Sequence, residues 1–258
     1  MTRLKELIAV SSASVRSPSA KVVVPGTYNL RDLGGLGTID GRRIRHGALY
    51  RSDALHLLDD AGRAAVRGLG LRSIVDLRSD DEVASQPSAL DAIDLDVHHV
   101  PLFARAAPSS MGELTLAAVY GEMVRTCGEA FVGAVRAVLA DAPVLVHCTA
   151  GKDRTGLVVA FGLEAMGVHR DEVVADYALS GANLDGEWAS RHIARLETLG
   201  VAPSAALRTI LVSSPPDVLR DVLEGIDEQY RSPRAYLAAY GLEPDELAAL
   251  ATLFTEEE

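Results

Sequence analysis

The sequence predicts a single α/β domain in which helices flank a central, mainly parallel or mixed sheet and a helical half follows toward the C-terminus. Short apolar runs at 73–77, 95–100 and 143–147 have the length and composition of strands. Longer segments with helical periodicity separate them, and only helical patterns follow from residue 157 onward. No linker or internal repeat divides the 258 residues, and a hydrophobic content of 48% is enough to bury one large core.

The predicted elements can be justified in chain order. Residues 1–20 contain several serines and are expected to form a flexible N-terminal arm, so the folded domain is expected at 21–258. Leu58-Asp59-Asp60 ahead of an apolar periodic run is typical of an N-capped helix. The expected helices are 58–70, 113–141 with an interruption near Cys127-Gly128, 157–166, 171–179 and several more, the last at 244–254.

Composition narrows the function classes. The net charge of −11 disfavours nucleic acid as a partner, and no apolar run approaches the ~18–20 residues of a membrane span. Residues 7–10 are too short for a secretory signal, so a cytoplasmic protein is expected, with export without a cleaved signal peptide left open. Two cysteines argue against a disulfide framework and fit a reducing compartment. No oligomeric state is predicted.

The most informative segment is 147–156, directly after the strand 143–147. Cys148 and Arg154 are separated by five residues whose backbone N–H groups can converge on one anion. A helix start near Thr155 adds its dipole, and Arg154 can hold two phosphate oxygens. In that field Cys148 is expected to be a nucleophilic thiolate. The predicted phosphate-binding residues are Thr149, Ala150, Gly151, Lys152, Asp153, Arg154 and Thr155.

This pattern predicts hydrolysis of phosphate monoesters through a cysteinyl-phosphate, without a metal or organic cofactor. A plain connection with Cys148 in the core is the simplest alternative. It leaves unexplained why four charged or titratable residue types crowd the carboxyl end of a strand, where α/β proteins bind ligands. A nucleotide-binding P-loop is excluded, because Val146 stands where its first glycine should be and Asp153 replaces its Ser/Thr.

The loop resembles the signature of the Cys-dependent protein tyrosine phosphatases, and its Gly-Lys-Asp-Arg-Thr-Gly form is similar to a bacterial group of that family. Further landmarks of the resemblance are 26–35, 49–53, 75–79, Glu82-Val83, 226–230 and 235–237. The resemblance implies a tyrosine phosphatase-like fold and a phosphorylated protein as substrate. A phosphoinositide phosphatase is the nearest alternative, since phosphatases of that kind also carry a lysine in this loop. A phosphate-binding pseudophosphatase is an alternative from another class, and a rhodanese-type sulfurtransferase is disfavoured by the Lys-Asp-Arg-Thr-Gly continuation.

Three loop residues have predicted roles beyond the cradle itself. Lys152 is expected to add a second cation over the phosphate, or else to be a solvated lysine. Thr155 can donate its hydroxyl to the Cys148 sulfur or cap the first turn of the helix. His147 is expected to hold the loop backbone through its ring nitrogens.

A second polar cluster lies in the N-terminal part of the sequence. The resemblance implies that Asn29, Arg31 and Asp32 brace the phosphate loop from beneath, and a surface turn is the alternative. Arg51, with Ser52 and Asp53, follows a short strand and can join that network. Asp76 is expected to form an ion pair with Arg78 near the site.

The general acid is the least obvious member of the predicted site. Related phosphatases often supply an aspartate from a loop after the strand that here ends at Val100, but this chain has no acid from there until Glu113. Asp153 is the preferred proton donor. The alternatives are that Asp153 only accepts hydrogen bonds and orients Arg154, with Glu113 or water as the proton source.

Two predictions concern residues away from the loop. Residues 103–128 are irregular at first and are predicted to form a mobile cover over the site, with a plain connection as the alternative. Cys127 is expected in the core, although a protective disulfide with Cys148 is conceivable. His98 and His99 point to opposite faces of a strand, which argues against a metal site.

Overall fold

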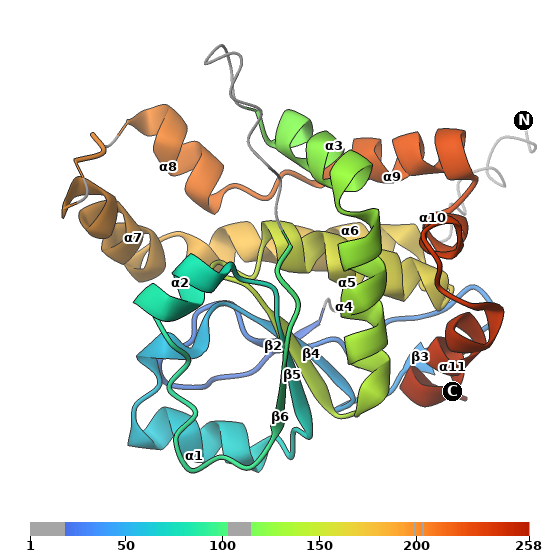
Figure 1. Ribbon diagram of the computed structural model, residues 1–258, viewed down its shortest axis with the longest axis horizontal. Coiled ribbons are helices and arrows are strands. Elements are labelled where there is room, and N and C mark those ends of the chain that lie inside the picture. Colours follow the sequence, from blue (N-terminus) through green and yellow to red (C-terminus); the bar gives the residue numbers. More distant parts are fainter. Residues whose placement is uncertain (1–18, 103–114, 199, 203, 258) are drawn as a thin grey trace, which may run out of the picture.

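The computed structural model describes residues 19–102, 115–198, 200–202 and 204–257. Figure 1 shows a mixed sheet with helices around it, as predicted. The strand order is β1-β2-β4-β7-β5-β6, in which β4, β7, β5 and β6 run parallel and β1 and β2 pair antiparallel at one edge. The strands are β1 Ala20–Lys21, β2 Arg31–Asp32, β4 Leu49–Ser52, β5 Ser73–Asp76, β6 Asp96–His99 and β7 Val144–His147. A separate pair joins β3 Arg43–Ile44 to β8 Thr255–Glu256.

The central strand β7 is buried along its whole length because helices cover both faces of the sheet. Val144 and Val146 face a large core built with α4, α5 and the C-terminal helices. Leu145 points the other way, into a smaller core with η1 and α1. This alternation explains why the sequence shows a continuous apolar run there rather than an alternating one.

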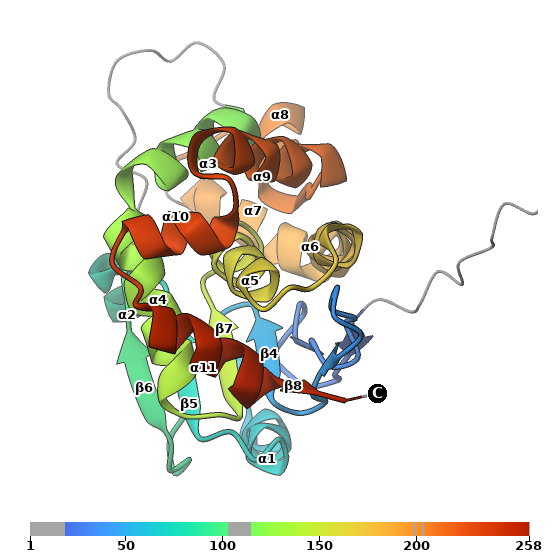
Figure 2. The same cartoon turned by 90° about the vertical axis from the view of Figure 1, so that its right-hand side faces the viewer.

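The part of the helical C-terminal half that spans residues 170–230 stands over the carboxyl ends of the parallel strands, whereas helix 244–254 lies beside the sheet (Figure 2). Its arrangement places the β7–α5 connection, which contains Cys148, between the sheet and several helices. The helical elements are η1 Leu55–Leu57, α1 Asp60–Gly68, α2 Asp80–Ser85, α3 Leu116–Thr126, α4 Gly128–Ala140, α5 Asp153–Ala165, α6 Arg170–Leu184, α7 Glu187–Thr198, α8 Ala205–Val212, α9 Pro216–Tyr230, α10 Pro233–Ala239 and α11 Pro244–Phe254.

Most predicted boundaries agree with the structure within a few residues. Asp59 caps α1 by accepting from the Gly62 amide, and the interruption near Cys127 separates α3 from α4. Helix α5 begins at Asp153, two residues before the predicted start. Helix α6 extends five residues past the predicted end at 179, because Ser180 is buried there and the Gly181 amide donates to the Ser214 hydroxyl. Tertiary contacts thus override the weak helix propensity of this Ser-Gly pair.

The predictions for the chain termini and cysteines have mixed outcomes. The first 18 residues of the predicted arm and residues 103–114 of the predicted cover lie outside the described residues. The folded domain begins before the predicted residue 21, because Ser19 is buried and its hydroxyl donates a hydrogen bond to Asp176. Cys127 is buried in the core, as expected, and Cys148 forms no disulfide. Within the described ranges, no helix has the length and apolar character needed to cross a membrane.

Candidate active site

The loop between β7 and α5 has a shape that depends on one glycine. Cys148 directly follows β7 and is 2% exposed. Gly151 adopts a positive φ of 64°, and a Cβ at this position would lie 2.1 Å from the carbonyl oxygen of Ser52. Glycine is therefore the residue that lets the loop turn sharply and rest on the end of β4. The Ala54 amide donates to the Thr149 carbonyl and holds the start of the loop.

The loop amides form a set of donors with no protein acceptor. Among the described residues, the backbone N–H groups of 149–152 make no recorded hydrogen bond, and α5 begins directly after them. The first N–H groups of a helix have no partner within the helix, and they carry the positive end of its dipole. The loop and the helix start together provide a binding site for one anion next to Cys148.

Arg154 faces this site and is oriented by Glu82. Its Nη1 and Nη2 donate to the two carboxylate oxygens of Glu82 at 2.6 and 2.8 Å. Burial raises the pKa of Glu82, but the hydrogen bond and charge of Arg154 prevail and lower that pKa to about 2. The Nε of Arg154 has no recorded partner among the described residues. One edge of the guanidinium is thus fixed by the carboxylate, while Nε stays available for an oxygen of a bound anion.

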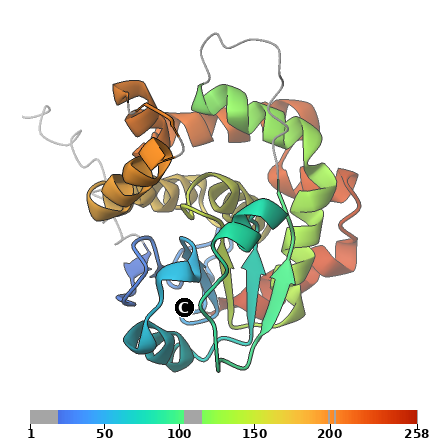
Figure 3. The ribbon, with the colours of Figure 1, turned by 60° about the vertical axis from the view of Figure 1, so that its left-hand side comes forward.

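Glu82 is a site residue for which the sequence predicted no role. It belongs to α2, which lies at the carboxyl end of the sheet in Figure 3. It closes a capping box with Ser79, and the Thr149 hydroxyl also donates to it. The Ser-x-x-Glu spacing indicates a helix N-terminus. That spacing gives no sign that the same carboxylate reaches across to Arg154.

Asp153 begins α5 and its side chain is 31% exposed. Its Oδ1 accepts a hydrogen bond from the Tyr120 hydroxyl at 2.5 Å, and Lys152 Nζ lies 3.5 Å from the same oxygen. The Tyr120 hydroxyl in turn lies 2.8 Å from that of Tyr177. Neither tyrosine was singled out in the sequence, because each lies within an ordinary helical pattern far from the loop.

Lys152 differs from the expectation that it adds a second cation over the phosphate. Its ammonium is fully buried and donates to the carbonyl oxygens of Ile210, Leu211 and Ser213 at 2.6, 3.2 and 2.9 Å. These groups lie at the C-terminal end of α8, where carbonyls lack helical partners and attract a cation. Burial lowers the pKa of Lys152, and the neighbouring Asp153 opposes that effect. Lys152 therefore links the loop to α8.

Thr155 and His147 are both fully buried beside the loop. The Thr155 hydroxyl has no hydrogen-bond partner, so the predicted bond to the Cys148 sulfur is absent from this structure. His147 Nδ1 lies 3.2 Å from the Cys148 carbonyl oxygen, as expected for a residue that holds the loop backbone. Burial lowers the pKa of His147, which favours the neutral imidazole.

The underside of the loop is held by a buried network. Asn29 donates to the Ala150 and Gly151 carbonyls, and Arg51 donates to the Gly151 carbonyl at 2.7 Å. Asp176 of α6 pairs with Arg31 at 2.7 Å and with Arg51 at 2.6 Å. Asn29, Arg31 and Arg51 thus occupy the position that the family resemblance implied. Arg51 is part of β4 rather than following a strand.

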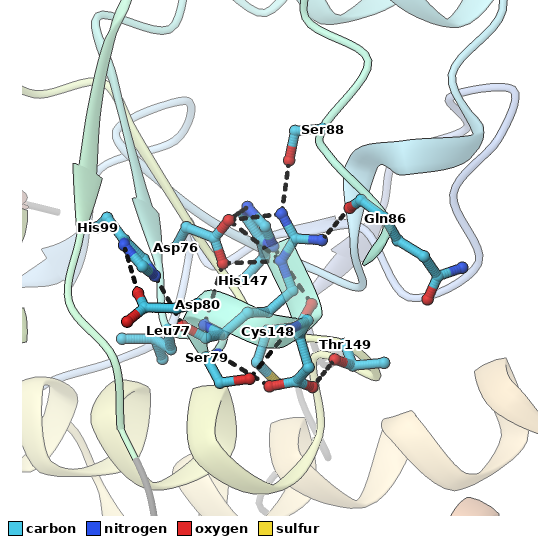
Figure 4. A network of polar contacts seen from close by, with 12 residues as sticks. Asp76, Leu77, Ser79, Asp80, Gln86, Ser88, His99, His147, Cys148 and Thr149 are labelled. Atoms are coloured by element: carbon cyan, nitrogen blue, oxygen red, sulfur yellow. Dashed lines mark hydrogen bonds and ion pairs between the residues drawn. The ribbon is translucent and has the colours of Figure 1, made fainter. Parts of the chain in front are cut away.

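Two predicted supporting residues do not contact the loop in the recorded bonds. Asp32 accepts from the Gly34 and Gly47 amides, so it stabilises its own turn. Asp76 pairs with Arg78 at 2.6 Å, as expected, and reaches the loop only through His147, whose Nε2 lies 3.7 Å away. Figure 4 shows Asp76 and His147 together, with Cys148 and Thr149 nearby.

Asp176 is a further residue that the sequence did not reveal. It is 1% exposed and lies in the middle of α6, with no motif around it. Burial raises its pKa, but the charges of Arg31 and Arg51 prevail and lower that pKa to about 2. The sequence offers Asp32 and Asp53 as nearer carboxylates for these arginines, but in the structure both accept from backbone amides, and Asp176 takes their place.

The fold and the loop define a class of protein. A cysteine directly after a central strand, loop amides that donate to no acceptor among the described residues, and an arginine at the helix start form the combination expected of a Cys-dependent phosphatase. The model of the tyrosine phosphatase family matches residues 22–256, and the chain belongs to this family. It is therefore a phosphoric monoester hydrolase.

Relatives and solved structures with similarity to this chain carry related names. The triple specificity protein phosphatase PtpB of Mycobacterium tuberculosis is 33% identical over 267 residues, which covers 85% of this chain and 93% of that protein. The tyrosine-protein phosphatase of Nostoc commune is 33% identical over 153 residues, covering 54% of this chain and 50% of that protein. A crystal structure of Pseudomonas aeruginosa TpbA with phosphotyrosine is 23% identical, covers 63% of this chain and 79% of that one, and has a TM-score of 0.41.

Proposed function

We propose that the protein hydrolyses phosphotyrosine-type monoesters in two steps through a cysteinyl-phosphate at Cys148. The observation that carries this proposal is the set of loop amides without a protein acceptor beside Cys148 and Arg154. A dianionic phosphoryl group matches these donors in charge and in number. Phosphotyrosine is the proposed class because phenols are better leaving groups than alkyl alcohols and the family carries that name.

In the first step the Cys148 thiolate attacks phosphorus in line with the leaving oxygen. The sulfur–phosphorus bond forms while the phosphorus–oxygen bond to the phenol breaks. The loop amides and Arg154 stabilise the charge on the three equatorial oxygens. Asp153 donates a proton to the leaving oxygen, so a neutral phenol departs and a carboxylate remains.

In the second step water attacks the phosphorus of the cysteinyl-phosphate. The Asp153 carboxylate accepts the proton of that water, the sulfur–phosphorus bond breaks, and Cys148 leaves as the thiolate. Inorganic phosphate is released and Asp153 is again protonated for the next cycle. The position of Asp153 at the start of α5, next to Arg154 and with 31% of its side chain exposed, supports this role.

The alternatives can be weighed against the contacts in the site. A phosphoinositide phosphatase was suggested by Lys152, whose ammonium here is bonded to α8 carbonyls. That alternative is left without a specific residue to support it. A phosphate-binding pseudophosphatase requires a defective site, whereas Cys148 and Arg154 are both in place at the ends of the loop.

The test is the hydrolysis of p-nitrophenyl phosphate by the wild type and by Cys148→Ser. The serine variant should lose essentially all turnover, because its hydroxyl has no comparable route to an anion at neutral pH. Cys127→Ser is the matched control, since it changes the other buried cysteine. EDTA should leave the wild-type rate unchanged. Substantial turnover by Cys148→Ser, or a rate that EDTA removes and a divalent metal restores, would contradict the cysteine mechanism.

We also propose that the protein works in the reducing cytoplasm. Cys148 forms no disulfide, and as the proposed nucleophile it must remain a thiol or thiolate. Mild oxidation should inactivate the enzyme, and a thiol reductant should restore it, because a sulfenic acid at Cys148 is reversible. Detection of the native protein outside the cell would contradict the proposed location.

A further inference from the structure

Two buried tyrosines form a hydrogen-bonded chain that ends at Asp153. The hydroxyls of Tyr177 and Tyr120 are 2.8 Å apart, and Tyr120 donates to Asp153 Oδ1 at 2.5 Å. Tyr120 is 0% and Tyr177 1% exposed, so water does not compete for these hydroxyls. Their rings meet edge to face, with centroids 6.3 Å apart and an interplanar angle of 79°. Such packing fixes both rings as well as both hydroxyls.

The two tyrosines come from different helices that converge on the start of α5. Tyr120 and Met123 form the buried face of α3, and α3 packs against α9. Tyr177 directly follows Asp176 on α6. Asp176 binds the arginines beneath the loop, whereas the Tyr177 hydroxyl contacts that of Tyr120. A Cβ at Gly156 would lie 3.0 Å from the Tyr177 ring, so glycine allows this close approach.

Both donors near Asp153 meet the same carboxylate oxygen. Tyr120 bonds Oδ1, and the Lys152 ammonium is also nearest to Oδ1, at 3.5 Å. Among the described residues, Oδ2 has no recorded partner. A neutral carboxyl group in this setting carries its proton on Oδ2, because Oδ1 already serves as the acceptor.

The Tyr120 hydroxyl remains a donor throughout the working range of pH. Burial, reinforced by the charge of Asp153, raises the pKa of Tyr120 well above its ordinary value. Burial likewise raises the pKa of Tyr177. Neither hydroxyl gives up its proton to the reaction, so their contribution is to hold a geometry.

We propose that Tyr120 is a positioning residue for the general acid: it binds Asp153 Oδ1 and so directs the proton-bearing Oδ2 toward the leaving oxygen. This inference rests on the proposed function, in which Asp153 is the acid. A partly exposed aspartate at a helix start otherwise samples several rotamers. A misplacement of about 1 Å in a reacting group can cost on the order of 10²-fold in rate.

The experiment compares Tyr120→Phe with wild type over aryl and alkyl phosphates of graded leaving-group quality. The ring stays in place, and only the hydroxyl that touches Asp153 is removed. The rate with p-nitrophenyl phosphate should fall a few-fold, and the rate with an alkyl phosphate should fall by up to ~10²-fold, within the range of general acid catalysis. KM should change little, since the phosphate cradle is intact.

Tyr236→Phe is the matched control. Tyr236 is also 0% exposed, and its hydroxyl donates at 2.7 Å to the Val124 carbonyl of the same helix α3. Removing that hydroxyl weakens the packing of α3 but leaves the contacts of Asp153 intact. Any loss of rate should therefore be equal for all leaving groups. Equal losses across the series for Tyr120→Phe would show a merely structural role and would overturn the proposal.

Asp153→Asn separates this inference from the proposed function. One outcome is that the loss of rate in Asp153→Asn varies strongly with the leaving group while the loss in Tyr120→Phe does not. In that case Asp153 remains the acid and only the role of Tyr120 is refuted. If Asp153→Asn loses rate equally for all substrates, the acid assignment fails and the positioning role fails with it. In the expected case, adding Tyr120→Phe to Asp153→Asn causes no further dependence on the leaving group.

Discussion

The underside and the open side of the catalytic loop are built in different ways. Beneath the loop, Arg31, Arg51 and Asp176 are at most 1% exposed. Asp176 pairs with both arginines, and Arg51 donates to the Gly151 carbonyl of the loop. On the open side, Glu82 and Asp153 keep 34% and 31% of their side-chain surface exposed. Their partners come from separate helices, so these contacts can adjust independently. The comparison indicates a buried base that fixes the loop and a more exposed rim on its open side.

The largest effect on stability is expected for Asp176→Asn in the base. Removing the one carboxylate between two buried arginines leaves buried charges unpaired, which typically costs about 3–5 kcal/mol. Urea unfolding measures this loss. The matched control is Asp227→Asn, which removes a partly exposed partner of Arg170 and should cost about 1 kcal/mol or less. Similar losses for the two variants would show that the buried pairs of Asp176 contribute no more to stability than a partly exposed ion pair.

Acid unfolding sharpens the same prediction. The pKa of Asp176 lies at about 2 in the folded protein against an ordinary 3.8, so its ionised form stabilises the fold. This contribution is fully present above pH 3.8 and is lost as the pH falls toward about 2. The wild type should lose stability across that window. Asp176→Asn should lack this part of the pH dependence of stability. If the variant lost stability between pH 3.8 and about 2 in the same way as the wild type, Asp176 would not be the responsible group.

A smaller effect is expected for Lys152→Met, which cuts the link between the loop and α8. Amide hydrogen exchange in residues 205–212 should accelerate roughly tenfold or more. This factor corresponds to the free energy that one charge-assisted hydrogen bond contributes to keeping the helix closed. Global stability should fall less than in Asp176→Asn. Lys21→Met on the exposed edge strand is the control. Unchanged exchange in α8 together with weaker phosphate binding would instead support the sequence-based expectation that Lys152 acts on the phosphate.

Local sequence signals were sufficient for the parts of the site that are contiguous in the chain. The apolar run 143–147, the Cys148–Arg154 spacing and Gly151 are neighbours, so their chemistry predicts a strand, an anion loop and a helix start. The fold class followed from the same periodicities. Family resemblance added Asn29 and Arg31, whose position beneath the loop no local pattern could reveal.

The missed residues share a physical cause. Glu82, Asp176 and Tyr120 act on the loop from α2, α6 and α3, and each occupies a position that its own helix would accept for ordinary reasons. Their partners are set by tertiary packing, which a periodicity does not encode. The contacts of Lys152 were missed for the same reason, because the α8 carbonyls that bind it lie about 60 residues further along the chain.

The most direct test of the central claim is detection of phosphate on Cys148 during turnover. A rapid denaturing quench followed by intact-mass and peptide analysis should find one phosphoryl group per chain, on the peptide that contains Cys148. With p-nitrophenyl phosphate, whose leaving group needs little protonation, Asp153→Asn should accumulate more of it, because the proposed base for hydrolysis is missing. Steady turnover with the phosphoryl group on another residue, or with none on Asp153→Asn, would contradict a cysteinyl-phosphate mechanism.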